Sequence, residues 1–357
     1  IAQKFLIDYI LTQCQLNIFT GEHYKKIKNE TKTVQQMRLK ILWGLKWKQP
    51  SFFGCCHHYK RSIHHKIARD DKFVPKSHQP SEDTIRTLSD FINSSRRLFV
   101  LTGAGLSTES GIRDYRSEGV GQYSITTDRP TQHIDFVKSP NKRQRYWARN
   151  FAGWPVFRNF QPNINHMVIA EMEKYGNVHW LVTQNVDGLH YKAGSSKITE
   201  LHGSTARVGC LSCDFEISRD NLQKILLRHN IWDEANIGRQ SPDADVVVPN
   251  HAVENFKMVD CPSCGGVLKP KVVFFGDNVA ASVKDFIFQK LDESDKMLVV
   301  GSSLQVYSSF RFILGAKERN IPIAILNIGE TRGDKHCNLK INAKAGDVLP
   351  RLLLPWK

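Results

Sequence analysis

The chain has 357 residues, a formal net charge of +15 and 41% hydrophobic residues. This length supports a sizeable hydrophobic core and predicts about two domains. Because no apolar run approaches the ~20 residues needed to cross a bilayer, the sequence predicts a soluble protein without a membrane partner. The first 80 residues hold 15 Lys/Arg and 5 Asp/Glu, so most of the basic excess is N-terminal, which disfavours a nucleic-acid partner.

Residues 1–78 are predicted to form a disordered N-terminal extension outside the fold. Between Met37 and Arg69 there are eight basic residues and no acidic one, interleaved with bulky apolar residues such as Trp43 and Trp47. A basic, acid-free, amphipathic stretch is typical of a mitochondrial transit peptide. The sequence therefore predicts a location in the mitochondrial matrix, with Met37 as a candidate start, and the alternative is a disordered basic tail.

Helical and strand patterns alternate along the rest of the chain. The helical patterns cover residues 79–95, 143–154, 165–176, 220–232 and 309–320. The buried strand patterns cover 96–103, 178–190 (a strand that runs into a polar loop), 271–276, 296–303 and 321–329. This alternation predicts a parallel sheet covered by helices on both faces. Each strand ends in small or polar residues, which predicts one ligand cleft at the carboxyl ends of the strands.

Four of the eight cysteines form two pairs, Cys210-x-x-Cys213 and Cys261-x-x-Cys264. Four thiolates satisfy a tetrahedral zinc ion and leave no open coordination position, so the pairs predict one structural zinc. Two redox pairs are the alternative. The stretch between the pairs is long for a plain zinc ribbon, which indicates an insertion.

The first strand runs into Gly103-Ala104-Gly105, which resembles a dinucleotide-binding turn except that Thr108 stands at the third glycine position. Glycines let backbone amides approach a diphosphate closely. A dehydrogenase would also need an acidic residue about 20 positions further on, at the end of a second strand, and none is clear. The polar stretch from Asp114 to Tyr123 is instead typical of a lid over a nucleotide.

Taken in order, "TGAGLSTESGIRDYRS", "TQNVDGLH", "LHGS", the cysteine pairs, "GSSLQV" and "NIG" resemble the sirtuin family over roughly residues 80–350, most of all its mitochondrial class II members. The resemblance implies an α/β fold, with a Rossmann-like parallel-sheet domain and a smaller zinc-binding and helical domain. The implied parts are the NAD-binding domain at 79–205 and 271–357, a helical module at about 112–165 and the zinc module at 206–270.

The resemblance also implies NAD-dependent protein-lysine deacylation that releases nicotinamide and O-acyl-ADP-ribose. The acyl groups would include lipoyl and carboxylate-bearing branched acyls. The partners would be acyl-lysine proteins, among them mitochondrial metabolic enzymes. The enzyme itself is expected to be a monomer. Protein mono-ADP-ribosyl transfer is the main alternative, because it needs the same NAD site. A non-catalytic NAD sensor is a further alternative, which the intact Asn185, Asp187 and His202 disfavour.

The residue roles follow by resemblance. Those implied to bind NAD are Gly103, Ala104, Gly105 and Thr108 at the diphosphate, Asp114, Tyr115, Arg116 and Tyr123 in the cofactor loop, Gln184, Asn185 and Asp187 at the nicotinamide ribose and carboxamide, Gly301, Ser302, Ser303, Asn327, Ile328 and Gly329 at the adenosine half, and Ala345 near the adenine. Asn185, Asp187 and His202 are implied to be catalytic. His202 is expected to be the general base, since the ordinary pKa of histidine, about 6.5, suits a proton acceptor near neutral pH.

Tyr146 and Arg149 are three residues apart and would share one face of a helix. The pair resembles the Tyr-x-x-Arg that holds a distal acyl carboxylate in acid-preferring class II sirtuins, and arginine can bind a carboxylate with two hydrogen bonds. The alternative is an exposed basic helix face. One departure from the family is Arg113, which replaces a usual proline and is expected to make the cofactor loop more mobile.

Overall fold

The computed structural model describes residues 70–231 and 237–354. The chain divides into two units, Ile1–Ser62 and Ile63–Lys357, and every described residue belongs to the second unit. The predicted transit segment between Met37 and Arg69 lies outside the described residues. Within the described part of the chain, no helix is long and apolar enough to span a membrane.

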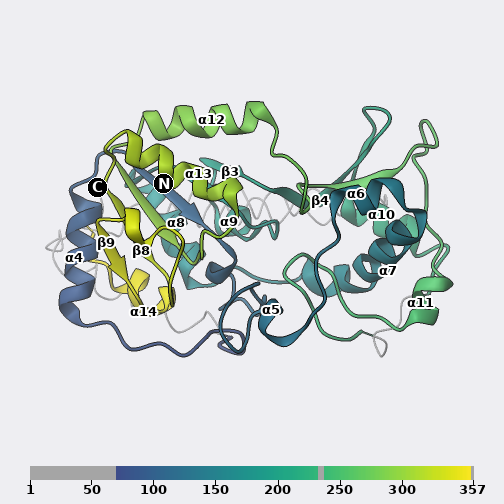
Figure 1. The fold of residues 1–357 in the computed structure, drawn as a ribbon, viewed down its shortest axis with the longest axis horizontal. Coiled ribbons are helices and arrows are strands. Elements are labelled where there is room, and N and C mark those ends of the chain that lie inside the picture. The colour runs from purple at the N-terminus through teal and green to yellow at the C-terminus, as the bar shows by residue number, and fades with distance from the viewer. Residues whose placement is uncertain (1–69, 232–236, 355–357) are drawn as a thin grey trace, which may run out of the picture. The chain divides into compact units, whose positions relative to one another are not determined.

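A six-stranded parallel sheet forms the larger part of the fold (Figure 1), as the alternating pattern predicts. Its strands, in spatial order, are β3 (Ile198–Glu200), β2 (Val178–Thr183), β1 (Leu98–Thr102), β7 (Lys296–Val300), β8 (Ile323–Leu326) and β9 (Leu339–Ile341). β1 lies in the middle, and all five of its residues are buried. The order reverses at β1, so the loops after β1 and β7 meet at a switch point, where open α/β sheets bind ligands.

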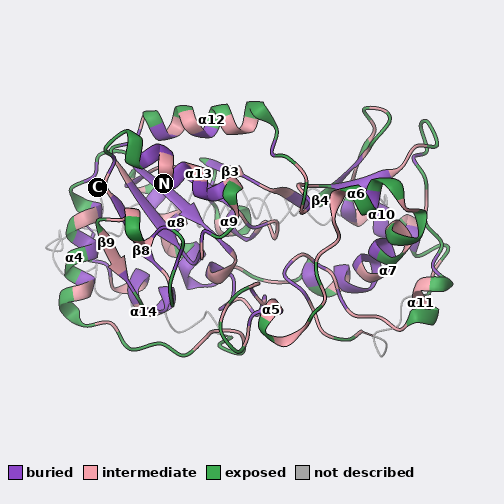
Figure 2. Cartoon of the chain, viewed as in Figure 1, coloured by how far each residue is buried: buried purple, intermediate pink, exposed green. Residues whose placement is uncertain are grey.

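Helices cover both faces of this sheet. The cores on the two faces are separate clusters, one around Leu98 and Val100 and the other around Phe99 and Leu101, because successive strand residues point to opposite faces. The covering helices are α4 (Glu82–Asn93), α8 (Ile164–Lys174), α12 (Ala281–Asp292), α13 (Tyr307–Glu318) and α14 (Ala345–Val348). Figure 2 shows α4 and α12 with exposed outer faces and the sheet buried between the helices.

Helix α4 lies within the helical pattern predicted at 79–95. The Ser81 hydroxyl accepts a hydrogen bond from the Thr84 backbone N–H at 3.2 Å, which caps the helix. Its buried residues, among them Ile85, Leu88 and Ile92, recur at helical spacing and form one apolar stripe.

A second, three-stranded antiparallel sheet has the order β5-β4-β6, from β5 (Glu216–Ser218), β4 (Gly203–Cys210) and β6 (Leu268–Val272). It packs with α6 (His133–Lys138), α7 (Pro140–Phe157), α10 (Arg219–Leu226) and α11 (Asn250–Glu254) around a core that includes Phe136, Trp147 and Val208. The predicted parallel strand at 271–276 is therefore wrong: β6 ends at Val272 and pairs antiparallel with β4. An apolar run of this length does not say which sheet it joins.

Residues 70–78, assigned by sequence to the extension, are part of the described structure. The Asp70 backbone N–H donates to the Glu109 carbonyl at 3.3 Å, and Asp70 forms an isolated parallel bridge with Ser110. The fold thus begins earlier along the chain than the composition suggests.

Candidate active site

A cavity of about 1140 Å³ lies where the carboxyl ends of β1, β2 and β7 meet the smaller sheet. Because pockets for one small ligand run from about 300 to 1000 Å³, this volume suits a cofactor and a second ligand together. The sequence-predicted residues that line the cavity are Ala104, Gly105, Asp114, Tyr115, Arg116, Tyr146, Gln184, Asn185, Asp187, His202, Gly301, Ser302, Ser303, Asn327, Ile328 and Gly329. Thr108 and Ala345 line a side cavity of about 30 Å³, while Gly103, Tyr123 and Arg149 line neither.

Glycines form a tight cradle at one wall of the cavity. The Gly105 backbone N–H donates to the Gly301 carbonyl at 2.9 Å, and a Cβ added at Gly105 would lie 2.9 Å from that same oxygen. A Cβ at Gly103 would lie 2.8 Å from the Cβ of Ser302. Gly301 itself has φ +61°, which favours glycine. This bare backbone surface fits the close approach of a diphosphate.

A buried network joins Asn185 to Asp187 through Ser107, a residue that the sequence prediction missed. The Asn185 side-chain amide donates to the Ser107 hydroxyl at 3.0 Å and to the Gly103 carbonyl at 3.1 Å. The Ser107 hydroxyl donates to the Asp187 carboxylate at 2.7 Å. Burial raises the pKa of Asp187, and the hydrogen bonds from Leu189 and Ser107 oppose that shift. The one feature of the sequence that could have indicated this role is the position of the Ser107 hydroxyl close to the glycine turn.

The imidazole of His202 is held at both nitrogens. Its Nδ1 lies 2.9 Å from the Gln184 carbonyl oxygen, which can only accept, so Nδ1 carries the proton. Its Nε2 lies 2.8 Å from the Ser308 hydroxyl, which donates to the neutral ring. Burial lowers the pKa of His202. The ring is therefore neutral near pH 7, with a basic nitrogen at the cavity, and Ser308 is a second residue that the sequence prediction missed.

Gln184 connects the ends of β1, β2 and β7. Its side-chain amide donates to the Ser302 hydroxyl at 2.8 Å and to the Thr102 carbonyl at 3.2 Å. The Asn327 side-chain amide donates to the Ile328 carbonyl at 2.7 Å beyond β8. These contacts fix the predicted adenosine-half residues against the ends of the strands.

The predicted cofactor loop closes over the cavity and is tied in place. Burial raises the pKa of Asp114, while hydrogen bonds from Ser117 oppose that shift. The Tyr115 ring packs 5.7 Å from the ring of Tyr123 and 5.9 Å from that of Phe275. Arg113, the residue behind the predicted mobility of this loop, donates to the Val120 carbonyl and stacks over the ring of Phe73.

Tyr146 and Arg149 both lie on α7, but only Tyr146 reaches the cavity. The Tyr146 ring is buried between Phe136 and Phe274. The Arg149 guanidinium Nε lies 2.6 Å from Asp245 Oδ1 and also donates to the Val246 carbonyl at 2.9 Å. The arginine proposed to hold an acyl carboxylate thus already holds a carboxylate of this chain.

Asp245 belongs to a β-hairpin at residues 238–247, within the insertion between the cysteine pairs. The hairpin is closed by Gly238 N–H donating to the Val247 carbonyl at 2.8 Å and Ser241 N–H donating to the Asp245 carbonyl at 2.7 Å. Its tip places Pro242 and Asp243 in the cavity wall. The insertion therefore reaches the active site. The sequence alone does not decide whether it does.

The four predicted metal ligands converge at one end of the smaller sheet. The sulfur atoms of Cys210, Cys213, Cys261 and Cys264 all lie within 4.8 Å of one another. Cys210 and Cys264 are 3.5 Å apart, and Cys213 and Cys261 are 3.7 Å apart. Zn–S bonds of about 2.3 Å in a tetrahedron give S–S separations of about 3.8 Å. The cluster fits one structural zinc held by these four thiolates.

A doubly covered parallel sheet, a glycine cradle at its switch point, a neutral histidine in the cavity and a four-cysteine module define a nucleotide-binding enzyme with a structural metal module. The family model described as the Sir2 family matches residues 103–308. The chain belongs to the Sir2 family, and it is an enzyme of that family.

The relatives extend the match over most of the chain. It is 52% identical over 278 residues to the human "NAD-dependent protein lipoamidase sirtuin-4, mitochondrial", covering 78% of this chain and 88% of the relative. It is 51% identical to the bovine protein of the same name, with the same coverage, and 48% identical to the "NAD-dependent protein deacylase Sirt4" of Drosophila melanogaster, covering 82% of this chain and 93% of the relative.

Solved structures share the fold. The structure described as "Sir2-p53 peptide-NAD+" is 27% identical, with a TM-score of 0.60, covering 75% of this chain and 97% of that chain. Another, described as "Structural Basis for the Mechanism and Regulation of Sir2 Enzymes", is 28% identical, with a TM-score of 0.60, covering 76% of this chain and 97% of that chain.

Proposed function

We propose that the protein is an NAD-dependent protein-lysine deacylase of mitochondria, acting in the matrix on acyl-lysine side chains of other proteins. The observation that carries this proposal is the neutral His202, which lines the cavity together with the glycine cradle and the Asn185–Asp187 pair. The names of the relatives and the basic, acid-free stretch before residue 70 support the location.

We assign the glycine cradle to the diphosphate of NAD and the Asn185–Asp187 pair to its nicotinamide ribose. NAD supplies an electrophilic ribose carbon that the acyl oxygen of the substrate attacks as nicotinamide leaves. The Ser107 hydroxyl holds the Asp187 carboxylate and the Asn185 amide in fixed positions, so both present their polar atoms without reorganisation. His202 Nε2 accepts a proton from a ribose hydroxyl, because the Gln184 carbonyl keeps the proton on Nδ1.

We propose lipoyl and carboxylate-bearing branched acyl groups as substrates. The aromatic wall of Tyr146, Phe274 and Phe275 suits a long apolar acyl chain. An acyl group that bears a carboxylate can pair with Arg149 only after the ion pair between Arg149 and Asp245 breaks. A preference for acidic acyl groups therefore requires the Asp245 side chain to move. We also propose the domain bounds predicted from the sequence, except that the first part of the NAD-binding domain begins at residue 70.

The test is incubation of the zinc-loaded full chain with NAD and a panel of acyl-lysine peptides, followed by mass spectrometry. We expect nicotinamide, deacylated peptide and O-acyl-ADP-ribose in equal amounts, and loss of all three in His202→Asn. Nicotinamide release with ADP-ribosylated protein and no deacylation would replace the proposal with ADP-ribosyl transfer. NAD binding without nicotinamide release would replace it with a non-catalytic sensor.

A further inference from the structure

The segment preceding α4 lies across the mouth of the cofactor cavity. We call residues 70–76 the strap. Its sequence, "DDKFVPK", has an apolar centre flanked on both sides by charged residues. Composition places it in a disordered extension, yet the strap contributes Val74, Pro75 and Lys76 to the lining of the main cavity.

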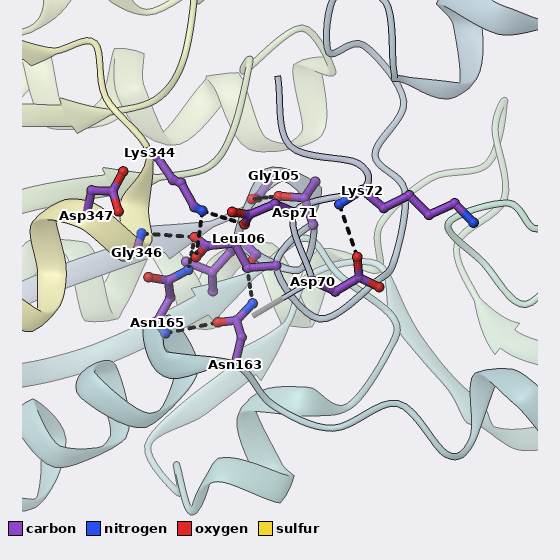
Figure 3. A network of polar contacts seen from close by, with 12 residues as sticks. Asp70, Asp71, Lys72, Gly105, Leu106, Asn163, Asn165, Lys344, Gly346 and Asp347 are labelled. Atoms are coloured by element: carbon purple, nitrogen blue, oxygen red, sulfur yellow. Dashed lines mark hydrogen bonds and ion pairs between the residues drawn. The ribbon is translucent and has the colours of Figure 1, made fainter. Parts of the chain in front are cut away.

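The strap is tied to the core by a polar network that runs from the exposed Asp71 to the buried Glu109 (Figure 3). The ammonium of Lys344 pairs with the Asp71 carboxylate of the strap and lies 3.7 Å from the buried carboxylate of Glu109. Glu109 in turn accepts hydrogen bonds from the Asn165 side-chain amide at 2.8 Å and from the Gly346 backbone N–H at 2.9 Å. Lys344 directly precedes the start of α14, so the tie joins the strap to the adenine side of the predicted site.

Two further contacts hold the strap against Glu109 and against Arg113 at the start of the cofactor loop. The Asp70 backbone N–H donates to the Glu109 carbonyl, and the Phe73 ring lies 4.2 Å from the guanidinium carbon of Arg113. A guanidinium stacked on an aromatic face is attracted to it electrostatically, so this contact favours the docked position of the strap. Arg113 also donates to the Val120 carbonyl, so one side chain joins the strap to the turn of the loop.

The apolar centre of the strap covers one particular part of the site. Val74 and Pro75 line the main cavity and also the small side cavity, and both cavities include Gly105, Asn327 and Ile328. The side cavity is completed by Ala345. These are the residues predicted for the diphosphate and adenosine half, so the strap faces that half and not the nicotinamide end around His202.

Lys76 gives the strap a positive charge, which suits an anionic ligand in the same part of the cavity. It is exposed, lines the main cavity and has no ion-pair partner among residues 70–231 and 237–354. An unpaired ammonium at the rim of a cavity attracts an anionic ligand, and the effect weakens as salt is added.

We propose that the strap is the outer wall of the adenosine half of the cofactor site, with Val74 and Pro75 covering the adenosine and Lys76 contributing positive charge toward the diphosphate. The inference rests on the proposed function, because it takes NAD as the ligand. It assigns a binding role to residues that precede the family match, which begins at residue 103.

The main readout is ADP-ribose binding, which does not depend on turnover. ADP-ribose affinity is measured by calorimetry on the full chain for the wild type, for Val74→Gly/Pro75→Gly and for Lys76→Met. The control is Ser77→Gly/His78→Gly, which also places two glycines in this segment, just beyond the strap, at exposed residues that line neither cavity. We expect about a tenfold weaker ADP-ribose affinity in the first variant, about threefold and salt-sensitive weakening in the second, and no change in the control.

Two readouts separate a local effect from misfolding. The inhibition constant of free nicotinamide should stay at the wild-type value in the strap variants, because that ligand occupies the other end. In the wild type, ADP-ribose should slow tryptic cleavage after Lys72 and Lys76, a measurement that needs no variant. Equal ADP-ribose affinity in the strap variants and the control, or unprotected cleavage with saturating ADP-ribose, overturns the inference. Failure of the wild type to bind ADP-ribose would instead overturn the proposed function.

Discussion

The Nε atom of Arg149 on α7 lies 2.6 Å from Oδ1 of Asp245 in the hairpin of the zinc-module insertion. Burial raises the pKa of Asp245, Arg149 opposes the shift, and Asp243 reinforces it. Two carboxylates of this chain therefore share the surroundings of one arginine. A third carboxylate, brought by a substrate acyl group, must compete with them.

Replacing Asp245 by Asn should favour acidic acyl groups. The amide keeps the size of the side chain but releases the charge of Arg149, so kcat/KM for a glutaryl peptide relative to an acetyl peptide should rise about fivefold to tenfold, or about 1–1.4 kcal/mol. Steady-state kinetics with the two peptides measure the ratio. The matched variant Arg149→Leu should lower it, and an unchanged ratio in Arg149→Leu would remove Arg149 from acyl recognition altogether.

The same ratio should depend on pH. Because the folded pKa of Asp245 is raised, its carboxyl gains a proton as the pH falls from neutral toward 5, while an exposed acyl carboxylate with a pKa near that of Glu, about 4.3, stays ionised. The acidic-to-acetyl ratio should therefore rise as the pH falls through this window. In Asp245→Asn the rise should be smaller, with only Asp243 left to titrate beside Arg149. Taking the ratio removes the titration of His202, which affects both substrates equally.

His202 should set the acidic limb of activity. Since burial lowers its pKa, the base form persists below the ordinary value of about 6.5, and kcat/KM for an acetyl peptide should fall only at a lower pH. Ser308→Ala removes the hydroxyl bonded to Nε2 and should shift this limb while retaining activity. His202→Asn should reduce kcat by a factor of at least 100 without abolishing ADP-ribose binding. A pH profile identical in Ser308→Ala would show that the contact does not tune the base.

Loss of one zinc ligand should destabilise the smaller sheet. Cys264→Ser should lose bound zinc, measured by elemental analysis, and lower Tm by an amount equivalent to several kcal/mol. The control is Cys337→Ser, a thiol outside the cluster. Equal zinc content and Tm in the two variants would contradict a four-thiolate site.

Gly153→Ala tests whether the hairpin docks on α7. A Cβ at this position would clash with the Ala244 carbonyl oxygen and lie 2.9 Å from Val246 Cγ1. In an unobstructed helix this change stabilises by about 1 kcal/mol, whereas an overpacked contact costs about 1–3 kcal/mol. We expect a lower Tm together with a raised acidic-acyl ratio, as the hairpin and Asp245 move away. A Tm above the wild type would show that the hairpin does not occupy this face.

Sequence alone predicted the covered parallel sheet because its strands are short, buried and separated by helices with clear periodicity. It predicted the zinc cluster because two Cys-x-x-Cys pairs have the spacing typical of the four ligands of a tetrahedral zinc ion. It assigned residues 271–276 to the wrong sheet, since an apolar run does not indicate which strand it will pair with. It also missed β3 and β9, which are three residues each and too short to show a period.

The sequence predicted which glycines and which histidine come together, since Gly105, Gly301 and His202 all line the cavity. Ser107 and Ser308 were missed because serine is common, and only the hydrogen bonds to Asp187 and His202 single them out. The pairing of Arg149 with Asp245 was invisible for another reason. The two are far apart in sequence, and the contact exists only because the insertion folds back onto α7.

The central pairing of the large sheet joins distant parts of the chain, since Leu98 in β1 pairs with Lys296 in β7. Closing so long a loop carries a large entropy cost and slows folding of a sheet that depends on it. The glycine cradle crosses this same joint, with Gly105 from one side and Gly301 from the other. A dinucleotide bound there ties the early and late halves of the chain together. Cellular NAD concentration should thus govern the lifetime of the folded protein as well as its rate of turnover.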